Sequence, residues 1–175
     1  MPRMSTLVRL ITAPAGRWRS ADDRQRTLQV VQPGLIGLID GTISTLAPIF
    51  ASAYLAGSRA ALMVGIAAAL GAAISMGLSE GLSDDGALTG RGAAATRGLI
   101  TGGATFVGGT FHALPFLMSD LSTALALAYA VVAVELLAIA WIRRRFLAVP
   151  LSRSLIQVTA GGVVVAAVGA LLGHA

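Results

Sequence analysis

The stretch that decides the fold is VVQPGLIGLIDGTISTLAPIFASAY, residues 30–54. It is apolar apart from a few hydroxyl and amide side chains, and its one charged residue is Asp40. A helix of about 20 apolar residues crosses the ~30 Å hydrocarbon layer of a bilayer. The stretch therefore predicts a transmembrane helix that carries an acid, and it begins too late in the chain to be a cleaved signal peptide.

Four further apolar stretches follow, at residues 60–82, 99–118, 121–142 and 155–172. With the first stretch they predict an all-α, polytopic membrane protein with five transmembrane helices. Only residues 56–59 separate the first two stretches, and only residues 119–120 separate the third from the fourth, so both pairs are expected to form tight antiparallel hairpins. We expect a basic cytoplasmic tail over residues 1–29 and a five-helix transmembrane domain over residues 30–175.

The composition argues against an ordinary soluble enzyme. Of the 175 residues, 55% are hydrophobic and 12% are charged, with a mean hydropathy of +0.79. A soluble domain of this length needs a more polar surface. The absence of cysteine excludes disulfides and thiolate metal sites, and neither a phosphate-binding loop nor an HExxH motif is present. We therefore expect no enzymatic activity and no resident cofactor.

The basic residues give the expected orientation. All thirteen are arginine, and the formal net charge is +5. In the five-span arrangement only Arg59 falls on one side of the bilayer, and the other twelve fall on the opposite side. Because positive residues are retained in the cytoplasm, the N-terminus is expected inside and the C-terminus outside. This excess of charge indicates orientation rather than a nucleic-acid partner. The tail shows no organelle signal, so a bacterial inner membrane is the expected location.

Three acids lie inside the predicted spans, where a carboxylate is usually kept for an ion or proton path. Asp40 lies about nine residues into the first span, roughly 14 Å from its inner end. Glu135 lies about eight residues before Arg143, at nearly the same depth. Met76 and Glu80 are four residues apart and share a face of the second span. These four side chains predict a metal path that opens to the cytoplasm, and the thioether favours a transition metal over Mg²⁺ or Ca²⁺.

Each of these four candidates has a structural alternative. Asp40 could hydrogen bond only to hydroxyl groups of a neighbouring helix, and Met76 could fill a packing gap. Glu80 could be a solvated acid or pair with Arg97. Glu135 could be a protonated packing residue or the partner of an arginine.

Two prolines and a histidine mark the outer halves of spans one and three. Pro48 and Pro115 each remove a helix hydrogen bond, at the carbonyls of Ser44 and Phe111. The freed carbonyls could be ion ligands, hinges or simple kinks. His112 lies one turn before Pro115 and could be an exit ligand, a proton carrier or a packing residue.

Glycine pairs four residues apart let helix backbones approach closely in a bilayer. They predict tight packing within one subunit or between subunits, at Gly37/Gly41, Gly77/Gly81 and Gly98/Gly102.

Two motifs resemble those of a known family. GLIDGT at residues 37–42 and SMGLSEGLS at residues 75–83 are similar to the first-span and second-span motifs of the vacuolar iron transporter family. Weaker similarity extends over residues 34–172. The family implies a homodimer of five-span subunits that exports Fe²⁺, and often Mn²⁺, in exchange for protons.

The resemblance also assigns roles to individual residues. It implies that Asp40 and Met76 line the pathway at the dimer interface, where Gly37 and Gly41 would admit a second copy, and that Glu80 lies near the cytoplasmic mouth. Members with a glutamate-rich cytoplasmic domain insert it between spans two and three, where this chain has only about fifteen residues. Glu135 has no counterpart in the family pattern and is left as a metal or proton group.

These observations favour a divalent-metal exporter, with metal ions, protons and lipid as its partners. The alternative from another class is a membrane scaffold that transports nothing and whose acids only bind neighbouring helices. Transport of an organic cation is disfavoured because the chain has only nine aromatic residues to line a site.

The topology is tested by cysteines introduced at Ala148 and Ala175, since the chain has none of its own. An impermeant maleimide applied to intact cells should label the cysteine at 175 and leave the one at 148 unlabelled, because the arginine distribution puts them on opposite faces. The reverse pattern would overturn the five-span topology.

Overall fold

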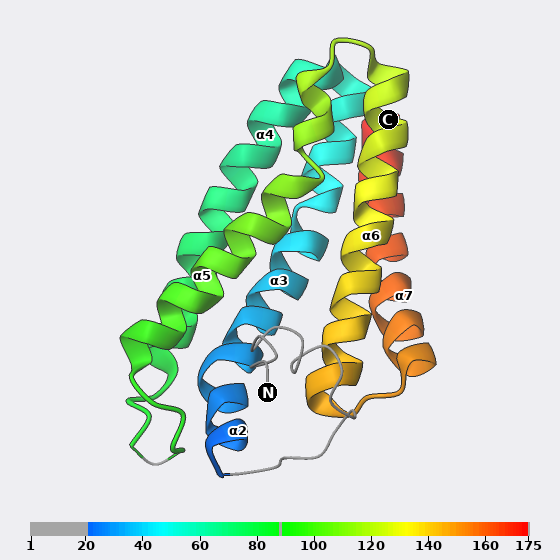
Figure 1. Ribbon diagram of the computed structural model, residues 1–175. Helices are drawn as coiled ribbons and strands as arrows, with labels where there is room; N and C mark the ends of the chain where they lie inside the picture. Colours follow the sequence, from blue (N-terminus) through cyan, green and yellow to red (C-terminus); the bar gives the residue numbers. More distant parts are fainter. Residues whose placement is uncertain (1–20, 88, 175) are drawn as a thin grey trace, which may run out of the picture.

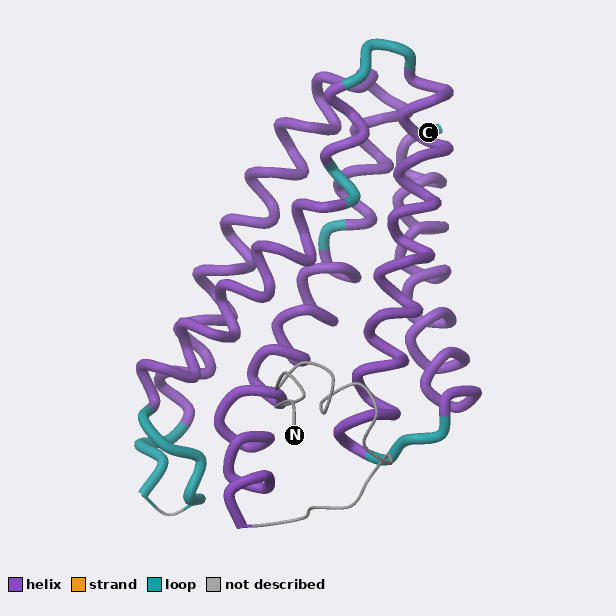
Figure 2. Tube along the Cα trace, viewed as in Figure 1, coloured by secondary structure: helices purple, strands orange, loops and turns teal. Residues whose placement is uncertain are grey.

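The computed structural model describes residues 21–87 and 89–174, which form helices and no strand (Figures 1 and 2). The all-α fold class is thus confirmed. Of the predicted basic tail, residues 1–20 lie outside the described residues, and residues 21–29 are helical. The elements in chain order are α2 (Ala21–Arg26), the π-helical turn η1 (Thr27–Val31), α3 (Gln32–Ser44), α4 (Leu46–Ser83), α5 (Ala94–Phe111), the 3₁₀ turn η2 (Leu114–Leu117), α6 (Leu121–Leu147) and α7 (Leu151–Gly173).

A single glycine reverses the chain inside α4. Gly57 has φ 82° and ψ −175°, a backbone conformation that glycine adopts without a steric penalty. The residues before it continue upward from α3, and those after it run back down beside α5 (Figure 1). The hairpin predicted at residues 56–59 therefore exists, but one residue makes the turn. At residues 119–120 the predicted short connection is also present, and the Asp120 carboxylate caps α6 by accepting the Thr123 N–H at 2.8 Å.

The prolines end helices where the sequence indicated. The α-helical hydrogen bonding pauses at Thr45, three residues before Pro48, and separates α3 from α4. Likewise α5 ends at Phe111, and the chain continues through η2, which contains Pro115. In both places the proline has no N–H for the carbonyl four residues earlier.

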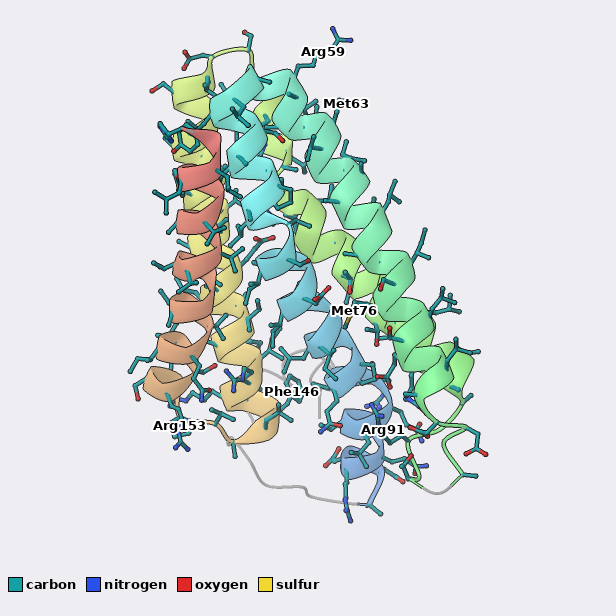
Figure 3. The ribbon with its side chains drawn as sticks, turned by 180° about the vertical axis from the view of Figure 1, so that it is seen from behind. Arg59, Met63, Met76, Arg91, Phe146 and Arg153 are labelled. Atoms are coloured by element: carbon teal, nitrogen blue, oxygen red, sulfur yellow. The ribbon has the colours of Figure 1, made fainter. Side chains whose placement is uncertain are left out.

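The two ends of the bundle differ in charge. Arg91 and Arg153 lie at one end, and Arg59 lies at the other (Figure 3). The loop after α4 and the connection from α6 to α7 are at the same end as α2, whereas the reversal within α4 and the end of α7 are at the opposite end (Figure 1). Among the arginines labelled in Figure 3, Arg91 and Arg153 thus lie together and Arg59 lies apart, as the sequence predicted.

The surface of the described chain is that of a membrane protein. Three helical stretches are long and apolar enough to cross a bilayer: Ala21–Ser83, Leu121–Leu147 and Leu151–Gly173. Only 17% to 33% of the most apolar part of each is buried. Large apolar side chains point outward instead, as Leu82 does at 82% exposure and Leu99 at 79%. Such a surface is stable in lipid and not in water.

Helix α5 packs on α3 through glycines. A Cβ at Gly37 or Gly41 would overlap the carbonyl oxygen of Thr101 or Thr105, respectively. From the other side, a Cβ at Gly108 would lie 2.8 Å from the Leu38 carbonyl oxygen. The backbones therefore approach so closely that only hydrogen fits. The expectation that Gly37 and Gly41 admit a second copy is wrong, because α5 of the same chain covers them.

The other two glycine pairs join α5 to α4. A Cβ at Gly98 would lie 2.6 Å from the Gly77 carbonyl oxygen, and one at Gly102 would lie 2.7 Å from the Ala73 carbonyl oxygen. Helix α5 is thus held between α3 and the second half of α4 by small residues on both of its sides. All three predicted glycine pairs serve packing within one chain.

We predict that Gly41→Ala destabilises the fold by about 1–3 kcal/mol, because its methyl group would push α5 away from α3. Gly103→Ala in α5 is the matched control, since a Cβ there meets nothing within 4 Å. Thermal unfolding of the purified proteins in detergent should show a lower Tm for Gly41→Ala alone. Equal Tm values for the two variants would contradict the close α3–α5 contact.

Candidate functional site

Glu80 is the centre of an ion cluster at the end of α4. Its Oε1 accepts hydrogen bonds from Arg91 Nη2 at 2.7 Å and from Arg97 Nε at 2.8 Å. The Glu80 side chain is 10% exposed and the Arg97 side chain 1%. Of the two readings left open by the sequence, the pairing of Glu80 with Arg97 is the one observed.

The remaining donors of Arg97 close the loop after α4. Arg97 Nη1 donates to the Gly92 carbonyl at 2.8 Å, and Nη2 donates to the Asp84 carbonyl and to Asp84 Oδ2, at 3.0 and 3.1 Å. A buried guanidinium is thereby satisfied by two acids and two backbone carbonyls. The loop at this end is fastened to α4 and α5 by one side chain.

The same cluster changes the pKa of Asp84. Partial desolvation acts to raise its pKa, but hydrogen bonds from the Gly86 N–H and the Thr89 hydroxyl, with the charges of Arg97 and Arg91, outweigh that effect and lower the pKa from its ordinary value. Asp84 is thus a charged partner of the two arginines at neutral pH.

Asp40 lies on an outer face of α3. It is half-buried, and Ile36 and Ser44, one turn away on either side, are exposed. Its carboxylate forms no hydrogen bond or ion pair with any other described residue. The alternative in which Asp40 bonds hydroxyl groups of a neighbouring helix is therefore not observed within the described chain.

Met76 lies on the second half of α4. It is half-buried, and Figure 3 shows it on the edge of α4 nearest α3. Its neighbour Gly77 packs on α5, so the thioether lies beside that contact.

Glu135 and His112 form a buried pair between α5 and α6. His112 Nδ1 lies 2.9 Å from Glu135 Oε2, and His112 Nε2 lies 2.8 Å from the Thr45 hydroxyl oxygen. The His112 side chain is fully buried and that of Glu135 is 8% exposed. Glu135 thus pairs with a histidine and not with an arginine of the inner face.

The four predicted metal-site residues do not gather in one chain. Glu80 is held by arginines, Glu135 is held by His112, and Asp40 and Met76 lie on different helices. Within residues 21–87 and 89–174, no three Asp, Glu, His or Cys side chains are placed to hold a metal ion together.

The sequence reasoning missed the His112–Glu135 pair. The two residues are 23 positions apart on different elements, and nothing in either local pattern connects them. A usable signal was the buried polar stripe of α5, since Arg97, Thr101 and Thr105 follow one another at four-residue spacing and His112 lies seven residues further on.

No protein-family model, curated protein or solved structure matches this chain. The resemblance to the vacuolar iron transporter family therefore rests on the motifs at residues 37–42 and 75–83.

We predict that Glu80→Gln lowers the free energy of unfolding by about 3 kcal/mol, because it leaves the buried Arg97 with one carboxylate partner. Asp85→Asn is the control: Asp85 lies in the same loop and accepts only the Ala87 N–H at 2.9 Å. Its effect should stay within about 0.5 kcal/mol. Denaturant unfolding in detergent measures both, and indistinguishable values would show that Glu80 does not hold the loop.

Proposed function

We propose that this protein is a transporter of divalent transition metals, Fe²⁺ and Mn²⁺ first, which exports them from the cytoplasm in exchange for protons. The observation that carries the proposal is Asp40, a carboxylate within apolar α3 that has no polar partner in the described chain. An ionised group near the middle of a bilayer costs about 2.5–3.5 kcal/mol on insertion scales. An apolar residue there would make the chain more stable, so the acid is expected to have a ligand.

Met76 supplies a second ligand of suitable chemistry. Gly41, next to Asp40, packs on Thr105, and the turn of α4 that contains Met76 packs on Gly102. Asp40 and Met76 therefore differ in height along the bundle by roughly one to two helical turns. A carboxylate with a thioether favours Fe²⁺ or Mn²⁺ over Mg²⁺. We assign Asp40 and Met76 as ligands of the transported ion, and leave Glu80 and Glu135 to their ion-pair partners.

A single chain does not complete such a site, which supports a homodimer. On α3, Ile36 and Ser44 are exposed and Asp40 between them is half-buried, whereas α5 packs on the neighbouring face that holds Gly37 and Gly41. A second copy on this face would add its own Asp40, and two carboxylates would neutralise one divalent ion. Without metal the two acids would repel, so a proton would be taken up when the ion leaves.

The proposed protein has five spans with the arginine-rich end in the cytoplasm. The reversal at Gly57 divides Ala21–Ser83 into two antiparallel rods, which with α6 and α7 gives four apolar rods. Helix α5 would be the fifth, packed between the two halves of that hairpin. The arginines grouped at one end support this orientation by the positive-inside rule, and an inner bacterial membrane remains the proposed location.

We predict that Asp40→Asn inserts and folds normally but loses nearly all metal flux. Asparagine keeps the shape and a hydrogen-bonding group but cannot neutralise a cation. Uptake of Fe²⁺ and Mn²⁺ by liposomes under an imposed pH gradient measures the effect. Met76→Leu should weaken transport less and change the preference between the two metals, because it removes only the soft ligand.

Asp85→Asn serves as the control for loss of one negative charge, since Asp85 is an exposed loop residue. It should transport at the unmodified rate. If Asp40→Asn also transports at that rate, the proposed ligand assignment is wrong. If the unmodified protein moves neither metal, the scaffold alternative replaces the transporter.

A further inference from the structure

We infer that His112 and Glu135 form an internal proton-binding site, placed to load and release the proton that the transported ion is exchanged for. The exchange role rests on the proposed function, whereas the proton site follows from the geometry of the pair alone. Neither residue is among the assigned metal ligands. The site lies inside one subunit, away from the outer face of α3 that holds Asp40.

The pair is enclosed by the bundle. His112 follows the last residue of α5, Glu135 lies in the middle of α6, and Thr45 lies at the break between α3 and α4. His112 and Thr45 have no exposed surface, and Glu135 has 7%. Their neighbours along the chain are buried apolar residues: Leu46 follows Thr45, Ala113 follows His112 and Leu136 follows Glu135. Water is largely excluded, so the protons of the pair are fixed by its own hydrogen bonds.

Those hydrogen bonds determine where the protons are. The Thr45 hydroxyl donates to the Gly41 carbonyl at 2.8 Å, and a hydroxyl has one hydrogen to donate. At its 2.8 Å contact with His112 Nε2, Thr45 must therefore accept. His112 Nε2 therefore carries a hydrogen. A second hydrogen lies between His112 Nδ1 and Glu135 Oε2, in the hydrogen bond that joins these two atoms. Whether that second proton resides on nitrogen or on oxygen, the pair as a whole is neutral.

The second carboxylate oxygen is where a further proton can bind. Glu135 Oε1 is buried and has no hydrogen-bond partner among the described residues. An unpartnered buried carboxylate oxygen is costly unless a proton or a water molecule reaches it. Protonation at Oε1 would add one positive charge to the pair, and loss of the shared proton would leave one negative charge. The site can therefore gain or lose a proton without breaking the Thr45 bond.

The surrounding elements leave the pair electrostatically isolated within the described chain. No other ionisable side chain forms a hydrogen bond or ion pair with His112 or Glu135. Those that belong to the elements packed around the pair, or that cap them, are Asp40 of α3, Tyr54, Arg59 and Glu80 of α4, Arg97 of α5, Asp120 before α6, Tyr129, Arg143, Arg144 and Arg145 of α6, Arg153 of α7 and His174 after α7. Tyr54 and Tyr129 bond each other at 3.0 Å, and Glu80 pairs with Arg97. Among the described residues, the side-chain hydrogen bonds of the pair are therefore those between its two members and with Thr45.

A short covalent and hydrogen-bonded route connects the pair to Asp40. The chain of bonds runs from Glu135 through His112 and Thr45 to the carbonyl of Gly41, and Gly41 directly follows Asp40. A change of charge on His112 changes the bond that holds the end of α3. Arrival of a cation at Asp40 would likewise disfavour extra positive charge on the pair, about one to two turns away. Binding of the metal ion and binding of the extra proton would therefore oppose each other, and exchange of one for the other requires this opposition.

The proton assignment is tested by histidine ¹⁵N NMR of the full chain in lipid nanodiscs. The chain has two histidines, so in the His174→Gln variant every histidine side-chain signal comes from His112. His112 should carry a hydrogen on Nε2 at neutral pH, because Nε2 donates to the Thr45 hydroxyl in the inferred arrangement. Its Nδ1 signal should change in Glu135→Gln. If Nε2 of the otherwise unmodified protein carries no hydrogen, or if the Nδ1 signal is the same in Glu135→Gln, the site is not as inferred.

The exchange role is tested in liposomes that carry Mn²⁺ and a pH-sensitive dye. His112→Gln and Glu135→Gln keep hydrogen-bonding groups but cannot carry the proton, and His174→Gln is the matched control at an exposed histidine. Proton-driven Mn²⁺ flux should fall roughly 100-fold in the first two variants and stay unchanged in the third. Both should retain monodisperse elution, and Asp40→Asn should retain the His112 NMR signature.

The two proposals fail in different ways. If both variants exchange protons for Mn²⁺ at the unmodified rate and ratio, the exchange role is overturned while metal transport stands. If the unmodified protein moves no Mn²⁺ or Fe²⁺, the proposed function fails, and the NMR result still decides whether the proton site exists.

Discussion

The structure depends on how closely α5 lies to its two neighbours. Hydrogen atoms of Gly37, Gly41 and Gly108 occupy the contact with α3, and those of Gly98 and Gly102 occupy the contact with α4. In lipid the hydrophobic effect does not drive helices together, so dispersion contacts between backbones must do so. This contact also sets the position of the polar side chains that α5 carries, such as Arg97, Thr101 and Thr105, and of His112 directly after it.

A polar interior with an apolar exterior follows from that arrangement. Among the fully buried polar residues, Arg97, Thr101 and Thr105 lie on α5 and His112 directly follows it, Thr42 and Thr45 lie near the α3–α4 break, and Ser154 lies on α7. Many large aliphatic side chains are exposed. Threonine suits the interior because its hydroxyl can return to the carbonyl one turn earlier, as Thr105 does to Thr101 at 2.9 Å. At the two ends of this interior are Arg97, which contacts two acids, and His112, which contacts one.

The sequence predicted the helical class, the two hairpins and the grouping of the arginines, because each depends on local composition. It also predicted close helix packing at the glycine pairs, but not which helix packs on each pair. That choice depends on the path of α5, which no local pattern specifies.

The same limit applies to the polar contacts. Glu80 and Arg97 were candidates for a pair because both lie near one membrane surface. His112 and Glu135 were assigned to different depths, and their contact arises only from how α5 and η2 approach α6. The metal-site residues Asp40 and Met76 stay predictions.

The reversal at Gly57 has a consequence for how the protein reaches its membrane. In the proposed orientation the outer tip of the first hairpin has no loop, and Arg59 is the charged side chain beside it (Figure 3). The insertion machinery then has to move a single arginine across the bilayer while residues 21–83 enter as one helical hairpin. Both surfaces on which α5 packs, α3 and the second half of α4, would then already be in the bilayer when α5 enters it.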